Sequence, residues 1–262
     1  MKLLTSRDNP LVRQLHALAT SARDRRKSGE SLLDGAHLIS AALDAGWPLK
    51  SLIVSQDAAA RAEIVALLAR APSQVSRTQL PAALFSQVSP VETPSGILAL
   101  IDVPPADVWN PAADTVVVLD GVQDPGNIGT ILRTAAAAGV ADVLLTAGCA
   151  QAWSPKVLRA GMGAHFALRI REHADVLALL ADFPGPRLAT ALGPRARNLY
   201  QWELDRPVAW MFGAEGQGLS GSLLAAADGL VVIPMAAGIE SLNVGAAAAI
   251  CLFEQRRQRG LR

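Results

Sequence analysis

Short apolar runs alternate with helical segments along the second half of the chain, and this alternation constrains the fold more than any other feature. The run TVVVLD at 115–120 is apolar almost throughout, which is typical of a parallel strand covered on both faces. A helical pattern follows at 127–139 and closes at Gly139. Further apolar runs and helical patterns occupy 142–146, 154–164, 187–192, 208–212, 230–234 and 241–258. These elements predict an α/β domain whose parallel sheet is flanked by helices.

The first hundred residues show the same alternation less regularly. We expect a basic helix over 10–27, followed by strands and helices at 30–34, 36–46, 49–55, 58–70 and 95–103. The stretch 103–114 contains three prolines and is typical of a linker. We therefore predict two domains, 1–105 and 106–262. A length of 262 residues suits one or two domains.

Composition excludes several classes of protein. With 51% hydrophobic and 18% charged residues, the chain is not disordered as a whole. The N-terminus MKLLTSRDNP lacks the apolar core of a signal peptide, and no apolar run is long enough to span a membrane, so we expect a cytoplasmic protein. Two cysteines cannot form a disulfide framework. The four histidines are dispersed, and we expect no metal site.

Basic residues concentrate at the two ends of the chain. Residues 1–30 carry seven basic and three acidic side chains, a net charge of +4, and residues 254–262 carry four arginines and one glutamate, a net charge of +3. Because the whole chain has a net charge of +1, the remaining residues sum to −6. Such placement favours contact with a polyanion, and two solvated helix ends are the alternative. The N-terminal candidates for this contact are Arg7, Arg13, Arg23, Arg25, Arg26 and Lys27.

Three loops that follow predicted strands carry the candidate functional residues, because ligands of open parallel sheets bind at the carboxyl ends of strands. In the first loop, Asn127 stands where a helix N-cap is expected, and Arg133 follows six residues later in an otherwise apolar helix. A lone arginine after a glycine-rich turn could hold a phosphate. The alternative is an ordinary capping residue and a surface arginine that is solvated or ion-paired.

The second loop follows the run at 208–212 and contains four glycines. Three of them fit the GxGxxG spacing of dinucleotide-binding loops, but no acidic residue follows at the end of the next strand, so this signal is weak. Glu215 is either a ligand contact or a residue that braces the loop. In the third loop, Ser241 is expected as the N-cap of the last helix, Asn243 follows it, and the small residues 245–249 allow close packing.

Together and in this order, the three loops resemble the motifs of the SpoU (TrmH-like) family of RNA ribose 2′-O-methyltransferases, within the SPOUT superfamily. The matching stretches are DPGNIGTILRTAAAAG, FGAEGQGLS and IPMAAGIESLNVGAAAAICLFE. The resemblance is firm over 115–258. The N-terminal part, through NPLVRQLHAL and LLDGAHLISAAL, is less specifically similar to the family's accessory RNA substrate-binding domain, which has a ribosomal L30e-like α/β fold.

The resemblance implies an activity and an assembly. The family's catalytic domain is a parallel-sheet domain tied in a deep trefoil knot, and it forms a homodimer with active sites at the subunit interface. The implied reaction transfers a methyl group from S-adenosylmethionine to a ribose 2′-hydroxyl. The RNA is rRNA rather than tRNA, because the N-terminal part resembles that of rRNA-modifying members, although tRNA stays open. The residues implied to contact the cofactor are Thr190, Ala191, Leu192, Gly213, Ile233, Met235 and Leu242.

The resemblance also assigns catalytic roles. Arg133 would be the central residue, and because arginine has a pKa above about 12 we expect it to fix a phosphate and stabilise the developing alkoxide rather than act as a base. Asn127 would orient the ribose or Arg133, and Glu215 would brace the loops. Ser241 and Asn243 would bind the RNA backbone or order the site. The family commonly has Ser or Ala after SLNV, where this chain has Gly245.

Two other functions compete with this interpretation. A non-catalytic RNA-binding protein could keep the fold, but the loss of Asn127, Arg133 or Asn243 that would favour it has not occurred. A nicotinamide-dependent oxidoreductase would use the glycines of the second loop, but it leaves the other two loops unexplained. The sequence does not identify the RNA or the nucleotide.

Overall fold

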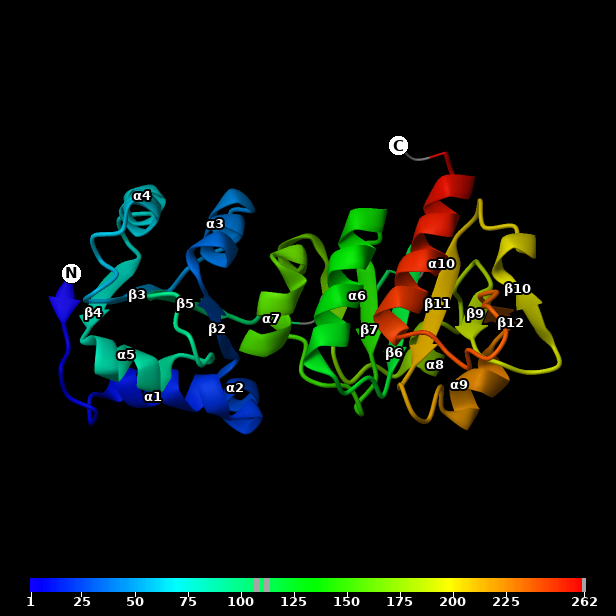
Figure 1. The fold of residues 1–262 in the computed structure, drawn as a ribbon, viewed down its shortest axis with the longest axis horizontal. Helices are drawn as coiled ribbons and strands as arrows, with labels where there is room; N and C mark the ends of the chain where they lie inside the picture. The colour runs from blue at the N-terminus through cyan, green and yellow to red at the C-terminus, as the bar shows by residue number, and fades with distance from the viewer. Residues whose placement is uncertain (106–108, 111–113, 261–262) are drawn as a thin grey trace. The chain divides into compact units, whose positions relative to one another are not determined.

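The computed structural model describes residues 1–105, 109–110 and 114–260, and the chain divides into two compact units (Figure 1). Unit 1 consists of 1–105 together with 153–166. Unit 2 consists of the described residues of 106–152 and 167–262. The segment 153–166 therefore packs in unit 1 although it lies within the range predicted as the second domain. The predicted linker at 103–114 lies partly outside the described residues.

Unit 1 is built on a mixed five-stranded sheet. Its strand order is β1-β4-β3-β5-β2, with parallel pairs on one side of β3 and antiparallel pairs on the other. Helices α1, α2 and α5 cover one face and α3 and α4 the other (Figure 1). The bounds are β1 (Lys2–Leu3), α1 (Pro10–Thr20), α2 (Ala22–Ser28), β2 (Glu30–Asp34), α3 (Ala36–Asp44), β3 (Ser51–Ser55), α4 (Ala62–Arg70), β4 (Ser76–Leu80), α5 (Ala82–Val88) and β5 (Ile97–Asp102).

The basic helix predicted over 10–27 is broken at Ser21. This residue is extended, with φ −115° and ψ 114°, and its hydroxyl accepts a hydrogen bond from the Asp24 amide at 3.2 Å. Ser21 thus ends α1 and caps α2, as serine does at helix N-termini.

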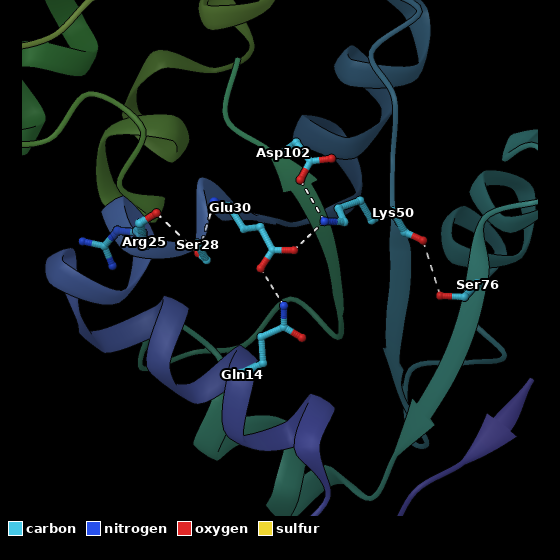
Figure 2. A network of polar contacts seen from close by, with 7 residues as sticks. All are labelled: Gln14, Arg25, Ser28, Glu30, Lys50, Ser76 and Asp102. Atoms are coloured by element: carbon cyan, nitrogen blue, oxygen red, sulfur yellow. Dashed lines mark hydrogen bonds and ion pairs between the residues drawn. The ribbon is translucent and has the colours of Figure 1, made fainter. Parts of the chain in front are cut away.

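A polar network ties α1 to three strands of unit 1 (Figure 2). Lys50 Nζ lies 2.6 Å from Glu30 Oε1 and 2.8 Å from Asp102 Oδ1, and Gln14 Nε2 donates to Glu30 Oε2 at 2.6 Å. The hydrogen bonds to Asp102 and Glu30 raise the pKa of Lys50. Glu30 is almost fully buried, and its carboxylate is satisfied by two donors, as burial of a charge requires.

An aromatic cluster explains why 153–166 packs in unit 1. The Trp153 ring lies 5.7 Å from the Trp47 ring and 5.2 Å from the His165 ring, while Phe166 lies 5.2 Å from Trp47. Helix α7 (Pro155–Gly161) follows Trp153, and Ser31 Oγ donates to the Trp153 carbonyl at 2.6 Å. Burying several aromatic rings against one another is strongly favourable, which fixes this segment on unit 1.

Unit 2 contains a seven-stranded sheet in the order β10-β12-β9-β11-β6-β7-β8, and each pairing of these strands is parallel. The prediction of a parallel α/β sheet is confirmed. The bounds of the strands and helices are β6 (Thr115–Asp120), α6 (Pro125–Ala138), β7 (Asp142–Leu145), β8 (Arg169–Arg171), α8 (Val176–Leu179), β9 (Arg187–Thr190), β10 (Ala196–Asn198), β11 (Val208–Gly213), α9 (Gly221–Ala226), β12 (Gly229–Val232) and α10 (Val244–Gln258). A short 3-10 helix in unit 2 is η2 (Leu199–Gln201), and another, η1 (Ala164–Ala167), lies where the chain passes from unit 1 to unit 2.

The two central strands, β6 and β11, are buried on both faces. Val116 and Val118 pack with Met211 against α8 and α9, while Trp210 faces α10 and donates its Nε1–H to Gln255 Oε1 at 2.8 Å. Side chains alternate between the faces of a strand, so each strand supplies both layers of the core. This double burial is the reason for the continuous apolar runs in the sequence.

Helices α6 and α10 lie side by side on one face of the sheet (Figure 1). A Cβ atom at Gly245 would lie 3.2 Å from Thr130 Cγ2 and 3.1 Å from Asn243 Oδ1. A side chain at Gly245 would therefore press against Thr130 of α6. None of the helices in the described ranges is long and apolar enough to cross a membrane.

Candidate functional site

A cavity of about 410 Å³ opens at the carboxyl ends of β9, β11 and β12 in unit 2. The loops after these strands and the approach to α10 form its walls. All seven residues predicted to contact the cofactor line this cavity, and they come from three separate parts of the chain: Thr190, Ala191, Leu192, Gly213, Ile233, Met235 and Leu242. Glu215 and Ser241 line it as well.

The glycine-rich loop after β11 folds back on the end of its own strand. The Ala214 amide donates to the Gly218 carbonyl at 3.1 Å, and the Gly218 amide donates to the Ala214 carbonyl at 2.8 Å. A Cβ atom at Gly213 would lie 2.2 Å from the Gly218 carbonyl carbon, so only glycine fits there. Gly218 has φ +67°, which favours glycine for a second reason. Two of the three glycines that fit the GxGxxG spacing, Gly216 and Gly218, thus lie in a tight turn at 214–218.

Three of the five predicted catalytic residues form a continuous chain of hydrogen bonds. Asn127 Nδ2 donates to Glu215 Oε1 at 2.5 Å, and Asn127 Oδ1 accepts from Asn243 Nδ2 at 2.9 Å. Asn243 Oδ1 in turn accepts from the Gly245 and Ala246 amides at 2.9 and 3.3 Å. Each amide group donates at one end and accepts at the other, so the chain has a single direction from the start of α10 to Glu215.

Two predicted helix caps are wrong. Asp124, not Asn127, caps α6, since its Oδ1 accepts the Asn127 amide at 2.8 Å and Pro125 takes the first helical position. Asn243, not Ser241, caps α10. Because Asp124 supplies the cap of α6, the Asn127 side chain does not bind the end of the helix and instead bridges Glu215 and Asn243.

Arg133 is separated from the other predicted catalytic residues. It is exposed on α6, two turns beyond Asn127, and does not line the 410 Å³ cavity. Among the described residues it has no hydrogen-bond or ion-pair partner. Gly126, Thr130 and Ala137 share its exposed side of the helix. Within one chain, therefore, the structure brings together Asn127, Glu215 and Asn243, places Ser241 in the cavity wall, and leaves Arg133 outside.

The six residues predicted to contact RNA differ in their exposure. Five of them are exposed on α1, on α2 or before α1: Arg7, Arg13, Arg23, Arg26 and Lys27. Arg25 is the exception, because its side chain is buried and donates from Nη1 to the Leu18 carbonyl at 2.7 Å. The turn at Ser21 directs Arg25 back onto the end of α1.

Three of the arginines near the C-terminus contact other groups of the protein. Arg257 Nη2 lies 2.7 Å from Glu254, Arg259 pairs with Asp114, and Arg256 Nη1 donates to the Ala138 carbonyl at 3.2 Å. These contacts fix the last turns of α10. Arg262 lies outside the described residues.

Sequence reasoning missed Asp120, the last residue of β6. Its Oδ2 accepts the Ser220 amide at 2.7 Å and its Oδ1 accepts the Thr146 hydroxyl at 3.0 Å, so it joins three loops at the carboxyl edge of the sheet. The available signal was its position: a carboxylate that directly ends a buried strand. In the described residues, no group of three or more His, Cys, Asp or Glu side chains could hold a metal ion.

Comparisons with known proteins match the whole chain. The model of the "SpoU rRNA Methylase family" matches residues 114–253, and that of the "MRM3-like substrate binding domain" matches residues 9–99. An uncharacterized tRNA/rRNA methyltransferase of Synechocystis is 35% identical over 97% of this chain and 93% of that protein. The 23S rRNA (guanosine(2553)-2′-O)-methyltransferase of Bacillus subtilis is 32% identical over 98% of this chain and 100% of that protein.

The fold is matched equally well. The crystal structure of an AdoMet-bound rRNA methyltransferase from Sinorhizobium meliloti superimposes with a TM-score of 0.85 at 28% identity, covering 98% of this chain and 97% of that one. The similarity thus extends over both units.

Proposed function

Because the chain belongs to the SpoU rRNA methylase family, we propose that it transfers the methyl group of S-adenosylmethionine to a ribose 2′-hydroxyl of structured RNA. The observation that carries this proposal is the 410 Å³ cavity, whose lining includes Glu215, the last member of the Asn243–Asn127–Glu215 hydrogen-bonded chain. The names of the relatives favour rRNA over tRNA as the substrate. The cytoplasm is the compartment we propose for the reaction.

The cavity suits the proposed cofactor. Gly216 is exposed and offers backbone groups that can bind an edge of an adenine, and Ile233, Met235 and Leu242 offer apolar surface to its rings and to the aliphatic chain. Bound S-adenosylmethionine supplies a methyl group activated by a sulfonium ion. The carboxylates of Glu215 and Glu240 on the cavity wall place negative charge where that cation would lie.

The hydrogen-bonded chain positions the acceptor. Asn127 is held at both ends of its amide, so its side chain cannot rotate freely, and Glu215 is held by Asn127. We assign to Glu215 and Asn127 the orientation of the ribose, and to Ser241 and Asn243 contacts with the RNA backbone. Fixing the hydroxyl in line with the methyl group accounts for a large part of the rate of such a transfer.

Arg133 requires a second subunit in this scheme. The exposed side of the α6–α10 layer carries small residues and Phe253, whose side chain is 47% exposed. A homodimer formed through this layer would cover Phe253 and would bring Arg133 of one copy toward the cavity of the other. There its guanidinium would hold the phosphate next to the target ribose and stabilise the developing alkoxide.

The remaining finer features are part of the same proposal. We propose that the segment between β12 and α10 threads a loop to form a trefoil knot, which is supported by the three non-consecutive segments that meet in the cavity wall. We further propose that unit 1 is an L30e-like RNA-binding domain. The match of 9–99 to a substrate-binding domain and the five exposed basic residues support this role.

Transfer of labelled methyl groups tests the function directly. The wild-type protein and Arg133→Ala are incubated with S-adenosylmethionine and separated rRNA and tRNA pools from a strain that lacks the gene. We expect an alkali-resistant 2′-O-methyl mark in rRNA that depends on Arg133. Labelling of tRNA alone would contradict the proposed substrate. Binding of S-adenosylhomocysteine without labelling of either pool would contradict the proposed reaction.

A further inference from the structure

Seven consecutive residues of unit 2, 213–219, line the 410 Å³ cavity proposed for the cofactor. They belong to the end of β11 and to the loop at 214–220 that leads to α9. Gly213 and Leu219 are buried, but residues 215–218 between them are exposed. An exposed segment rich in glycine loses much conformational entropy when it is ordered, so its conformation depends on the contacts that hold it.

Two hydrogen bonds join the 214–220 loop to distant segments of the described chain. Asn127 Nδ2 donates to Glu215 Oε1 at 2.5 Å, and the Ser220 amide donates to Asp120 Oδ2 at 2.7 Å. The other hydrogen bonds of the loop stay within it or reach only α9. The exposed segment therefore has one distant anchor at its start and one just beyond its end.

Asp120 lies beside both ends of this loop. In the sheet it pairs with Gly213, the residue from which the loop departs, and its carboxylate holds Ser220, the residue at which the loop ends. The Thr146 hydroxyl donates to the other carboxylate oxygen at 3.0 Å and accepts the Gly121 amide at 3.1 Å. Because both of its oxygens are engaged, the half-buried carboxylate of Asp120 is fixed in its direction toward Ser220.

We propose that Asp120 is a positioning residue that holds the 214–220 loop in the conformation that binds the cofactor. The inference rests on the proposed function, because it takes S-adenosylmethionine as the occupant of the cavity. Without the carboxylate, the loop is released at Ser220, and only a fraction of the molecules present the complete cavity wall. The dissociation constant of the cofactor then rises in inverse proportion to that fraction. Bound cofactor orders the loop again, so kcat at saturating cofactor changes little.

The two anchors of the loop should have different kinetic effects. Asn127 belongs to the hydrogen-bonded chain that orients the ribose, whereas the hydrogen bonds of the Asp120 carboxylate go to Ser220 and Thr146. Loss of the Asp120 carboxylate should therefore raise the KM for S-adenosylmethionine, whereas loss of the Asn127 amide should lower kcat. Asp120 also lines an adjoining space on the other side of the loop. A direct contact with RNA in that space would instead raise the KM for RNA.

Calorimetry with S-adenosylhomocysteine and steady-state methyl transfer to rRNA from a strain that lacks the gene test this role. Asp120→Ala removes both acceptor oxygens, whereas Asp120→Asn keeps one oxygen for the Ser220 amide and offers an N–H to the Thr146 hydroxyl. Thr146→Val nearly keeps the shape of the side chain but removes the hydroxyl that fixes Asp120. Asp182→Ala is the matched control, because Asp182 is an exposed carboxylate of unit 2 that lines neither space.

We expect the affinity for S-adenosylhomocysteine to fall about tenfold in Asp120→Ala and about threefold in Thr146→Val, because each releases the end of the loop to a different extent. The KM for S-adenosylmethionine should rise in parallel, while kcat stays within about threefold of wild type. Asp120→Asn should keep most of the affinity, and Asp182→Ala all of it. Thr146 is half-buried and valine has its shape, so Thr146→Val will fold even if Asp120→Ala does not.

Three results would overturn this role of Asp120 while leaving the proposed function intact. Wild-type affinity for S-adenosylhomocysteine in a folded Asp120→Ala, or in Thr146→Val if Asp120→Ala does not fold, would show that the loop needs no such anchor. A rise in the KM for RNA alone would make Asp120 an RNA contact. An equal loss of affinity in Asp120→Asn would assign the effect to charge. A wild-type protein that does not bind S-adenosylhomocysteine would remove the proposed function itself.

Discussion

Asn127 bridges Glu215 and Asn243, although the sequence indicates a helix cap at this position. Its position at the start of a helix predicts a capping residue, but Pro125 shifts the start of α6 and gives the cap to Asp124. Residue type alone did not reveal that the freed amide spans Glu215 and Asn243. Arg25 shows the same limit, because its neighbours Arg26 and Lys27 are exposed while the turn at Ser21 buries it. Side-chain direction after a break in a helix is set by tertiary packing.

Removing the amide of Asn127 should impair the reaction more than the fold. We expect Asn127→Ala to lower kcat about 100-fold, since it releases both Glu215 and Asn243, and to lower the free energy of unfolding by less than about 1 kcal/mol. Because Glu215 acts through the same chain, Asn127→Ala combined with Glu215→Gln should cost little more than either change alone. Single-turnover methyl transfer and denaturant titration measure the two effects, and fully multiplicative losses in kcat would refute a shared chain.

At the scale of elements, apolar runs predicted every central strand of unit 2, because burial on both faces leaves a signature that no surface strand shares. Strands β4 and β10 were missed for the complementary reason. β4 reads SRTQL and β10 reads ARN, and polar residues of edge or partly exposed strands resemble loops. The helix predicted over 241–258 ends where α10 ends, at Gln258, but the sequence does not show that Arg257 and Arg259 pair with Glu254 and Asp114.

Gln255 anchors α10 to the sheet through three hydrogen bonds. Its Oε1 accepts from Trp210 Nε1, and its Nε2 donates to Thr115 Oγ1 and to the Arg206 carbonyl at 3.1 and 3.0 Å. Gln255→Leu leaves the buried indole N–H without an acceptor, so we expect a loss of about 2 kcal/mol in the free energy of unfolding. Gln201→Leu, at an exposed position, should change it by less than about 0.5 kcal/mol. Urea denaturation compares the two, and equal losses would show that the anchor contributes nothing.

The contact between Asp114 and Arg259 makes the end of α10 sensitive to acid. The hydrogen bond from Arg259 lowers the pKa of Asp114 below its usual value. A carboxyl group with a lowered pKa in the folded state stabilises the protein above its unfolded pKa, near 4, and that stabilisation is lost as pH falls through the folded value. Asp114→Asn should therefore be less stable than wild type at pH 7, and the difference should vanish toward pH 2. Thermal denaturation of both proteins at each pH measures this difference in stability. A difference that stays constant with pH would contradict the prediction.

At the scale of the whole molecule, the cofactor and the reaction could be inferred from the sequence. The way in which distant segments of the chain pack together could not. The resemblance of three loops to one family led to the cofactor and reaction, since those loops are short and keep their polar residues. The position of Arg133, outside its own chain's cavity, depends on how α6 packs against α10 and follows from no local pattern. The return of 153–166 to unit 1 is equally hidden, because its aromatic contacts join residues more than a hundred positions apart.

Disrupting the proposed subunit interface should separate assembly from cofactor binding. We expect Phe253→Glu to convert the dimer to a monomer in light scattering and to abolish methyl transfer, because Arg133 would no longer reach a second cavity. Leu177→Glu is the matched control, since Leu177 is 45% exposed against 47% for Phe253 and lies on α8, on the opposite face of the sheet. A Phe253→Glu protein that remains dimeric would place the interface elsewhere.

The exposed basic residues of unit 1 should govern the salt dependence of RNA binding. Replacing Arg13, Arg23 and Arg26 with alanine should lower the slope of log affinity against log salt by about 2, at roughly 0.7 for each lost contact with single-stranded phosphate. Arg25→Ala should leave the slope unchanged and instead destabilise unit 1 by about 2 kcal/mol, because the Leu18 carbonyl loses a charged, buried donor. Filter binding at several salt concentrations distinguishes the variants, and an equal slope for all of them would locate RNA contact elsewhere.

Because 153–166 packs in unit 1, cleavage of the main chain between 105 and 114 would divide unit 1 between two fragments. A cleavage between 105 and 114 yields an N-terminal piece that lacks Trp153 and α7, and a C-terminal piece that carries both. The smaller piece would then need the larger one to complete its aromatic cluster and to satisfy Ser31. The protein is thus suited to fragment complementation: expressed separately, the C-terminal piece would complete the fold of the N-terminal piece, and a nicked molecule would stay together without an intact main chain.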